Sequence, residues 1–142
     1  MKRRDTKLES EGAEFLVLGH LLTRGVPCYK AYTQTPGYDL LAHSKDGRRT
    51  VTIQVKSRWD RSARGFFLRS IDADFVVAVF LNRSPDDPEE PPEPTYYVLP
   101  KRTLKKHWRN DKTPKVYLPD ITNLARYESA WERIDRALAR GR

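Results

Sequence analysis

The chain has 142 residues, which is enough for one domain built around a single hydrophobic core. Lysine and arginine number 27 against 19 aspartates and glutamates, and the formal charge of +8 indicates an anionic partner, most commonly nucleic acid. Cys28 is the single cysteine, no apolar run approaches the length of a membrane span, and the N-terminus lacks a hydrophobic signal core. These features exclude an internal disulfide and predict a cytoplasmic protein with no membrane partner. A basic protein without a nucleic-acid partner is the alternative.

The first predicted element is a helix over residues 8–24, where apolar residues recur at helical spacing until Gly25 ends the pattern. Glu11 and Glu14 lie one turn apart on this helix and share a face. Each is either an ordinary surface carboxylate or part of an ion site. A weakly alternating strand follows at residues 28–33.

Residues 36–57 predict a β-hairpin, because two apolar runs flank an Asp-Gly turn. In the second run Gln54 and Lys56 lie on one face of the strand, about 6.6 Å apart. Asp39 opens the first run, and the pairing of the hairpin can bring its carboxylate beside them. The alternative is an ordinary hairpin with a solvated polar face.

An acid, an amide oxygen and a lysine on one small surface are the groups that metal-assisted phosphodiester hydrolysis needs. Asp39 and Gln54 would bind a hard cation, Mg²⁺ or Mn²⁺, through oxygen. Lys56 would orient or help to deprotonate the attacking water and stabilise charge on the phosphorane. No zinc site is expected, because the histidines and Cys28 lack ligand spacing.

Arginine and tryptophan interleave directly after this strand. Arginine suits phosphate contact and tryptophan suits stacking, so the segment is predicted to contact nucleic acid. A flexible solvated loop is the alternative. The residues are Arg58, Trp59, Arg61 and Arg64.

A short strand is predicted at residues 66–68, and a continuous apolar run at 75–81 predicts a central strand buried on both faces. Residues 96–100 return as its hairpin partner. Between these strands, residues 84–95 contain five prolines and five acids and predict a mobile loop. The loop is a plain linker or an acidic flap that competes for the basic surface. Asp72 and Asp74 are expected to cap a bend rather than to bind a metal.

Basic residues gather at the start of the next predicted helix, over residues 101–108. They form the strongest basic cluster and are predicted to grip phosphates, the alternative being a solvated amphipathic cap. A short strand at 116–118 and a last helix over about 123–140 follow, the helix with an apolar stripe for core or dimer contact. The basic cluster consists of Lys101, Arg102, Lys105 and Lys106.

The pattern Pro36-x-x-Asp39 followed by Gln54-Val55-Lys56 resembles the PD-(D/E)XK nuclease superfamily, in the form where glutamine replaces the second acid. That form occurs in the branch with intron-homing endonucleases and relatives of Holliday-junction resolvases. The resemblance covers roughly residues 9–99.

Members of this superfamily also carry a glutamate on the helix before the motif. Glu14 has that spacing, and Glu11 is the second candidate. The resemblance implies that Glu14 joins Asp39 and Gln54 in holding Mg²⁺ or Mn²⁺. The neutral Gln54 removes one charge from the metal site.

The length and the order of the predicted elements indicate that residues 1–142 form a single domain of the α/β (α+β) class, which fits the arrangement of the superfamily. Its restriction-endonuclease-like fold would have a mixed central β-sheet flanked by helices. The expected function is metal-dependent hydrolysis of phosphodiester bonds in DNA, although the sequence does not distinguish DNA from RNA. Cutting both strands of a duplex would require a homodimer or tetramer. A non-catalytic nucleic-acid-binding module is the main alternative, and a protein-interaction domain that uses the acidic loop is another.

Overall fold

The computed structural model describes residues 6–32, 37–84 and 92–139. Its helices, strands and 3₁₀ turns are α1 (Thr6–Thr23), β1 (Cys28–Lys30), β2 (Leu40–His43), β3 (Thr50–Asp60), β4 (Gly65–Phe67), β5 (Phe75–Arg83), β6 (Thr95–Pro100), α2 (Lys101–His107), β7 (Trp108–Arg109), β8 (Lys115–Tyr117), η1 (Leu118–Asp120), η2 (Leu124–Tyr127) and α3 (Glu132–Ala139).

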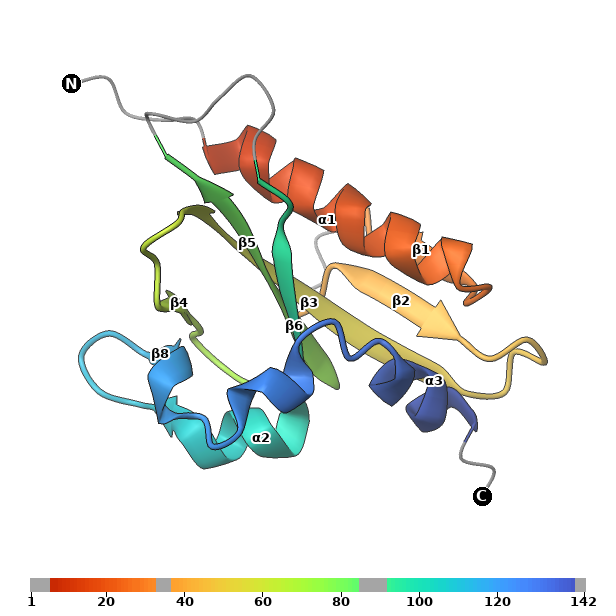
Figure 1. The fold of residues 1–142 in the computed structure, drawn as a ribbon. Coiled ribbons are helices and arrows are strands. Elements are labelled where there is room, and N and C mark those ends of the chain that lie inside the picture. Colours follow the sequence, from red (N-terminus) through yellow and green to blue (C-terminus); the bar gives the residue numbers. More distant parts are fainter. Residues whose placement is uncertain (1–5, 33–36, 85–91, 140–142) are drawn as a thin grey trace.

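A five-stranded mixed sheet forms the centre of the molecule, in the order β1-β2-β3-β5-β6. Neighbouring strands are antiparallel except for β3 and β5, which are parallel. One face packs with α1 and α3, and the other packs with α2 and a second, three-stranded sheet of order β4-β8-β7 (Figure 1). This arrangement confirms the predicted mixed α+β class with a central sheet between helices.

The central strand β5 separates two hydrophobic clusters. Val77 and Val79 pack into the cluster beneath α1 and α3, whereas Val76 and Ala78 pack into the cluster beneath α2 and the small sheet. All four side chains are buried. The prediction of a strand buried on both faces is therefore confirmed.

The predicted hairpin is confirmed as β2 and β3, with Leu40 opposite Ile53 and Ala42 opposite Val51. The strand β3 continues further than predicted, to Asp60, because it keeps pairing with β5 beyond the end of β2. Residues 58 and 59 consequently belong to a strand rather than to a connecting loop.

The connection between the parallel strands β3 and β5 contains β4 instead of a helix. Parallel neighbours always need such a crossover, and an α-helix is the usual solution. Here β4 leaves the large sheet and pairs with β8, a strand from much later in the chain. The indole Nε1 of Trp108 in β7 then donates to the main-chain oxygen of Leu68, at 2.8 Å. Trp108 thus ends the helix that was predicted to include it and ties the small sheet to the crossover.

The prediction of one long last helix is wrong. The chain forms the 3₁₀ turn η2 and then, after a break, the shorter helix α3. Asn123 and Ser129 adopt left-handed backbone angles, with φ of 57° and 48°, which interrupt a helix. The Ser129 amide instead donates to the main-chain oxygen of Tyr96, at 2.8 Å, and draws the break onto the edge strand β6.

This break divides the apolar stripe between the two faces of the sheet. Leu124 and Tyr127 pack against the cluster beneath α2, whereas Trp131, Ile134 and Leu138 belong to the cluster beneath α3. The stripe is therefore core within the chain.

Some predictions fall on residues that the structure does not describe. These are Pro36, the end of the first predicted strand, most of the acidic proline loop and the last residues of the final helix. In the described part of that loop, the Asn82 side chain donates to the main-chain oxygen of Glu93, at 3.0 Å. Among the described helices, none is long and apolar enough to cross a membrane.

Candidate active site

Asp39 lies directly before β2 and is held by both neighbouring strands. Its main-chain oxygen accepts from the Ala31 amide, and its amide donates to the Ile53 oxygen, each at 2.8 Å. Its carboxylate oxygen Oδ2 accepts from the amide of Val55 in β3, at 2.7 Å. Asp39 is half-buried. Backbone and side chain together therefore fix the carboxylate against the middle of β3.

Gln54 and Lys56 flank the amide that binds this carboxylate. In the register of β3 with β5 they stand opposite Val76 and Ala78, so they share the face of the sheet that also carries α2 and the small sheet. Both are half-buried. The predicted trio of an acid, an amide and a lysine is thus brought to one place on the central sheet.

Burial and charge act against each other at this trio. Burial raises the pKa of Asp39, while the Val55 amide and the ammonium groups of Lys56 and Lys30 partly offset the rise. Burial lowers the pKa of Lys56. The Asp39 carboxylate opposes this shift, and the charge of Arg69 adds to it. The acid and the lysine therefore stabilise one another's charge in a site that favours neither charge alone.

Glu14 lies on α1, and its carboxyl group interacts electrostatically with that of Asp39. Burial raises the pKa of Glu14, and the Asp39 carboxylate raises it further. Its side chain is 20% exposed. The helix glutamate predicted from the resemblance is thus electrostatically coupled to the strand aspartate, as two neighbouring carboxylates are.

Lys30 in β1 is a residue that the sequence predictions missed. Its ammonium nitrogen lies 2.8 Å from Oε2 of Glu11 and 3.3 Å from Oε1 of Glu14, and it also lies 4.3 Å from the centre of the Phe15 ring. Its side chain is only 5% exposed. Burial alone would lower the pKa of Lys30, but the two glutamates raise it above its ordinary value. The ammonium therefore stays charged.

A signal for Lys30 was present in the strand pattern. Cys28 and Lys30 are two residues apart and therefore share a face of β1, and Cys28 is buried. A lysine on the inward face of a strand needs an acidic partner. The pair Glu11 and Glu14 on the preceding helix is such a partner.

The donor set determines which metal the site suits. The carboxylates of Asp39 and Glu14 and the amide oxygen of Gln54 are hard oxygen donors, which fit Mg²⁺ or Mn²⁺. In the described part of the chain, no group of three or more histidine, cysteine, aspartate and glutamate side chains could hold a metal ion. A cation here would accordingly depend on the glutamine as well as on the acids.

The residues predicted to contact nucleic acid after Lys56 have contacts within the chain. The Arg58 guanidinium donates to the Gly65 oxygen, and the Arg61 guanidinium donates to the Asn82 oxygen, at 3.3 Å. The ring of Trp59 is covered by Arg83, whose guanidinium carbon lies 4.8 Å from the ring centre. These three side chains connect β3 and the residue after it with β4 and β5. Arg61 and Arg64 are exposed.

The basic cluster on α2 lies on the same side of the sheet as Gln54 and Lys56. Arg102, Lys105 and Lys106 are exposed, and Lys101 is half-buried at the start of the helix. These cations are available to a bound anion.

Asp72 and Asp74, which were expected to cap a bend, both accept hydrogen bonds within the chain. Oδ2 of Asp74 accepts from the amide and the hydroxyl of Thr52, at 2.9 and 3.1 Å, and closes the bend onto β3. The Asp72 carboxylate accepts from the hydroxyl of Ser70.

Comparison with known proteins supports the fold but no family. No family model matches the chain, and no curated protein matches it. A solved structure entitled "The structure of a bacterial homing endonuclease: I-Ssp6803I" is similar, with a TM-score of 0.64 and 24% sequence identity over 93% of each chain. This chain therefore shares its fold, over nearly its whole length, with a homing endonuclease.

Proposed function

We propose that this protein is a metal-dependent endonuclease that hydrolyses phosphodiester bonds in DNA, with its site in the glutamine form of the PD-(D/E)XK arrangement. The observation that carries the proposal is the Asp39 carboxylate, fixed by the Val55 amide between Gln54 and Lys56. The nuclease-like fold and the net charge of +8 support it.

Each residue would have a separate role. Asp39, Gln54 and Glu14 would hold Mg²⁺ or Mn²⁺, which when bound supplies Lewis-acid stabilisation of the phosphate and activation of water. Lys56 would orient the attacking water, help to deprotonate it and stabilise the negative charge that develops on the phosphorane. Because Lys56 is half-buried, its charge acts through less screening solvent than that of a surface lysine.

Cleavage of both DNA strands would require two copies of this site. A single site of this kind acts on one strand, so a symmetric homodimer or tetramer would deliver two cuts. RNA remains an alternative substrate, because the same phosphodiester chemistry applies to it.

The second candidate is a non-catalytic nucleic-acid-binding module on the same fold. The neutral Gln54 favours it, and so does the ion pair between Lys30 and Glu14, since both reduce the attraction of the site for a cation. Binding of Mn²⁺ to the protein without DNA separates the candidates: the nuclease binds it through Asp39, and the module does not.

The test is cleavage of supercoiled plasmid and of a branched DNA junction at low salt, with Mg²⁺ and then Mn²⁺. Asp39→Asn and Lys56→Met are each expected to lower the rate by about a hundredfold or more, as loss of a catalytic group does. Lys45→Met, at an exposed lysine in the turn between β2 and β3, is the matched control and keeps activity.

Equal cleavage by all four proteins would show a contaminating nuclease and reject the assigned residues. Absence of cleavage on every substrate, together with absence of Mn²⁺ binding, would reject the nuclease and leave the binding module.

A further inference from the structure

The small sheet has one buried face and one exposed face, and the exposed face carries both aromatic rings and cations. Register places Phe67, Lys115 and Arg109 in one row across its three strands, because Lys115 stands opposite both of the others. Phe67 is 66% exposed, and Tyr117, which follows Lys115 on the same face, is 37% exposed. Their inward neighbours fill the core, so the outward row is not needed for packing.

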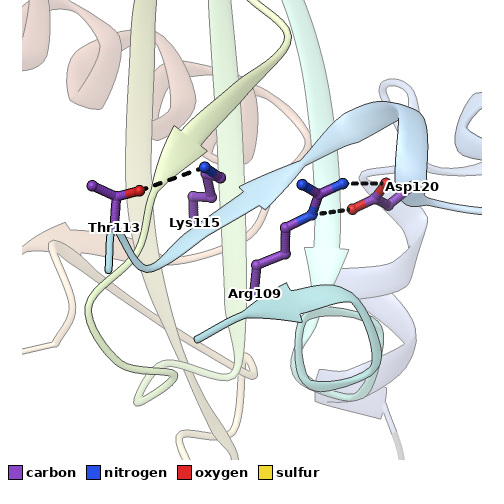
Figure 2. A network of polar contacts seen from close by, with 4 residues as sticks. All are labelled: Arg109, Thr113, Lys115 and Asp120. Carbon is purple, nitrogen blue, oxygen red and sulfur yellow. Dashed lines mark hydrogen bonds and ion pairs between the residues drawn. The ribbon is translucent and has the colours of Figure 1, made fainter. Parts of the chain in front are cut away.

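Polar contacts hold the cations of this row along the surface (Figure 2). The Arg109 guanidinium makes two hydrogen bonds to the Asp120 carboxylate, at 2.7 and 2.9 Å, and lies 5.1 Å from the centre of the Tyr117 ring. The Lys115 ammonium donates to the Thr113 hydroxyl at 3.5 Å. Arg109 is therefore oriented by a neighbouring acid, while Lys115 keeps its charge uncompensated by this contact with a neutral hydroxyl.

A shallow hollow on this face gathers more cations than acids. Its lining includes Arg58, Arg64, Phe67, Arg109, Lys115 and Tyr117. Asp120 offsets one of the four positive charges, so the surface stays positive with two exposed aromatic rings among the cations. Phosphates suit such cations, and sugars and bases suit such rings.

The small sheet is joined to the candidate active site. The connection from β4 to β5 is tied to β3, because the Asp74 carboxylate accepts from the amide and the hydroxyl of Thr52. The same connection packs against Gly37, two residues before Asp39, where an added Cβ would lie 2.7 Å from the Cβ of Asp72. Both the small sheet and the side chains of Gln54 and Lys56 occupy one face of the central sheet.

We propose that the exposed face of the small sheet, the surface of Arg64, Phe67, Arg109, Lys115 and Tyr117, binds the sugar-phosphate backbone of duplex DNA beside the bond to be cleaved. This inference rests on the proposed function and adds a contact surface to it. The positive charge and the exposed rings favour nucleic acid over a second copy of this chain, which is itself positively charged.

The test measures DNA binding rather than cleavage. The whole chain carrying Asp39→Asn is titrated with a fluorescent DNA duplex in EDTA, and anisotropy is followed at several salt concentrations. Adding Arg64→Gln and Lys115→Gln should weaken binding by about tenfold and reduce the slope of log K against log salt by roughly two, one per lost phosphate contact. Adding Phe67→Ser should weaken binding severalfold with no change of slope, because it removes no charge.

The matched control is the pair Lys45→Gln and Arg136→Gln, which removes the same charge from the turn between β2 and β3 and from α3. Lys45, Arg136 and Arg64 are exposed and Lys115 is half-buried, so neither pair removes a fully buried side chain. The control pair should change affinity by less than twofold. Equal loss in the two pairs, or no loss in the first pair, overturns the proposal, as does a parent protein that does not bind duplex DNA.

Two further outcomes separate this inference from the proposed function. Strong binding that is lost in the surface variants, with no cleavage of any substrate and no Mn²⁺ binding by the wild-type protein, would support the surface and reject the nuclease. If the surface variants change the sedimentation of the protein but not its DNA binding, the face is a contact between copies and the inference is wrong.

Discussion

At the scale of single residues, Lys30 changes the charge balance of the candidate site. Glu11, Glu14 and Asp39 contribute three negative charges, and Lys30 and Lys56 contribute two positive ones. Lys30 is too buried to serve as a contact for DNA phosphates. Its effect is therefore internal: it compensates the two glutamates and competes electrostatically with any cation near Glu14.

Removing this charge should strengthen cation binding. We expect Lys30→Met to bind Mn²⁺ on the order of tenfold more tightly than the wild type, because a positive charge leaves the neighbourhood of Asp39 and Glu14. Lys30→Arg keeps the charge and is the control. Calorimetric titration without DNA measures both. Weaker binding by Lys30→Met would instead mean that Lys30 is required to hold Glu14 in position.

The burial of Asp39 predicts a pH-dependent stability. Its pKa is raised in the folded protein, so the folded state holds the proton more tightly than the unfolded chain, and the ionised form lowers stability above the ordinary pKa of aspartate. Asp39→Asn should therefore raise the free energy of unfolding at pH 7, by at most about 1 kcal/mol because solvent still screens the half-buried carboxylate. The gain should vanish as the pH falls below that ordinary pKa. Denaturant titrations at pH 7 and pH 3 measure it, and an equal effect at both would contradict the electrostatic cause.

At the scale of elements, Gly65 determines whether β4 can pair with β8. A Cβ at this position would lie 2.4 Å from the main-chain oxygen of Val116, and a backbone atom in a strand cannot move away cheaply. Gly65→Ala should lower the free energy of unfolding by about 2 kcal/mol or more.

Gly12 in α1 offers the matched control, because an added Cβ there meets nothing within 4 Å. Gly12→Ala should raise stability by up to about 1 kcal/mol, since alanine favours a helix more than glycine does. Thermal unfolding followed by circular dichroism measures both variants. Similar changes in the two would show that the close approach at Gly65 relaxes freely.

The elements differ in how well the sequence predicts them. Local patterns predict the first helix, the hairpin of β2 and β3, and the buried strand β5, because their periodicity or turn chemistry is strong over many residues. The prediction of one long last helix failed because its apolar stripe fits a helix throughout, whereas the left-handed Ser129 makes a tertiary hydrogen bond to β6 that the stripe does not reveal.

At the scale of the whole molecule, the trio of Asp39, Gln54 and Lys56 could be predicted, because all three lie on one local hairpin. Lys30 could be found only by combining the inward face of β1 with the two glutamates of α1, and the small sheet could not be predicted from local patterns. The strands of the small sheet have two or three residues each, and β4 is far in the sequence from its partner β8. The row of Phe67, Lys115 and Arg109 can be recognised only when the pairing of these strands is known.

The crossover through β4 also has a consequence for synthesis of the chain. The ribosome delivers residues in order, so β3, β4, β5 and β6 emerge before β8. The large sheet can close as soon as β6 is available, but Gly65–Phe67 of β4 must wait for Lys115–Tyr117 of β8. A nascent chain therefore carries β4 as an unpaired edge, with its apolar Phe66 uncovered, until β8 has been made.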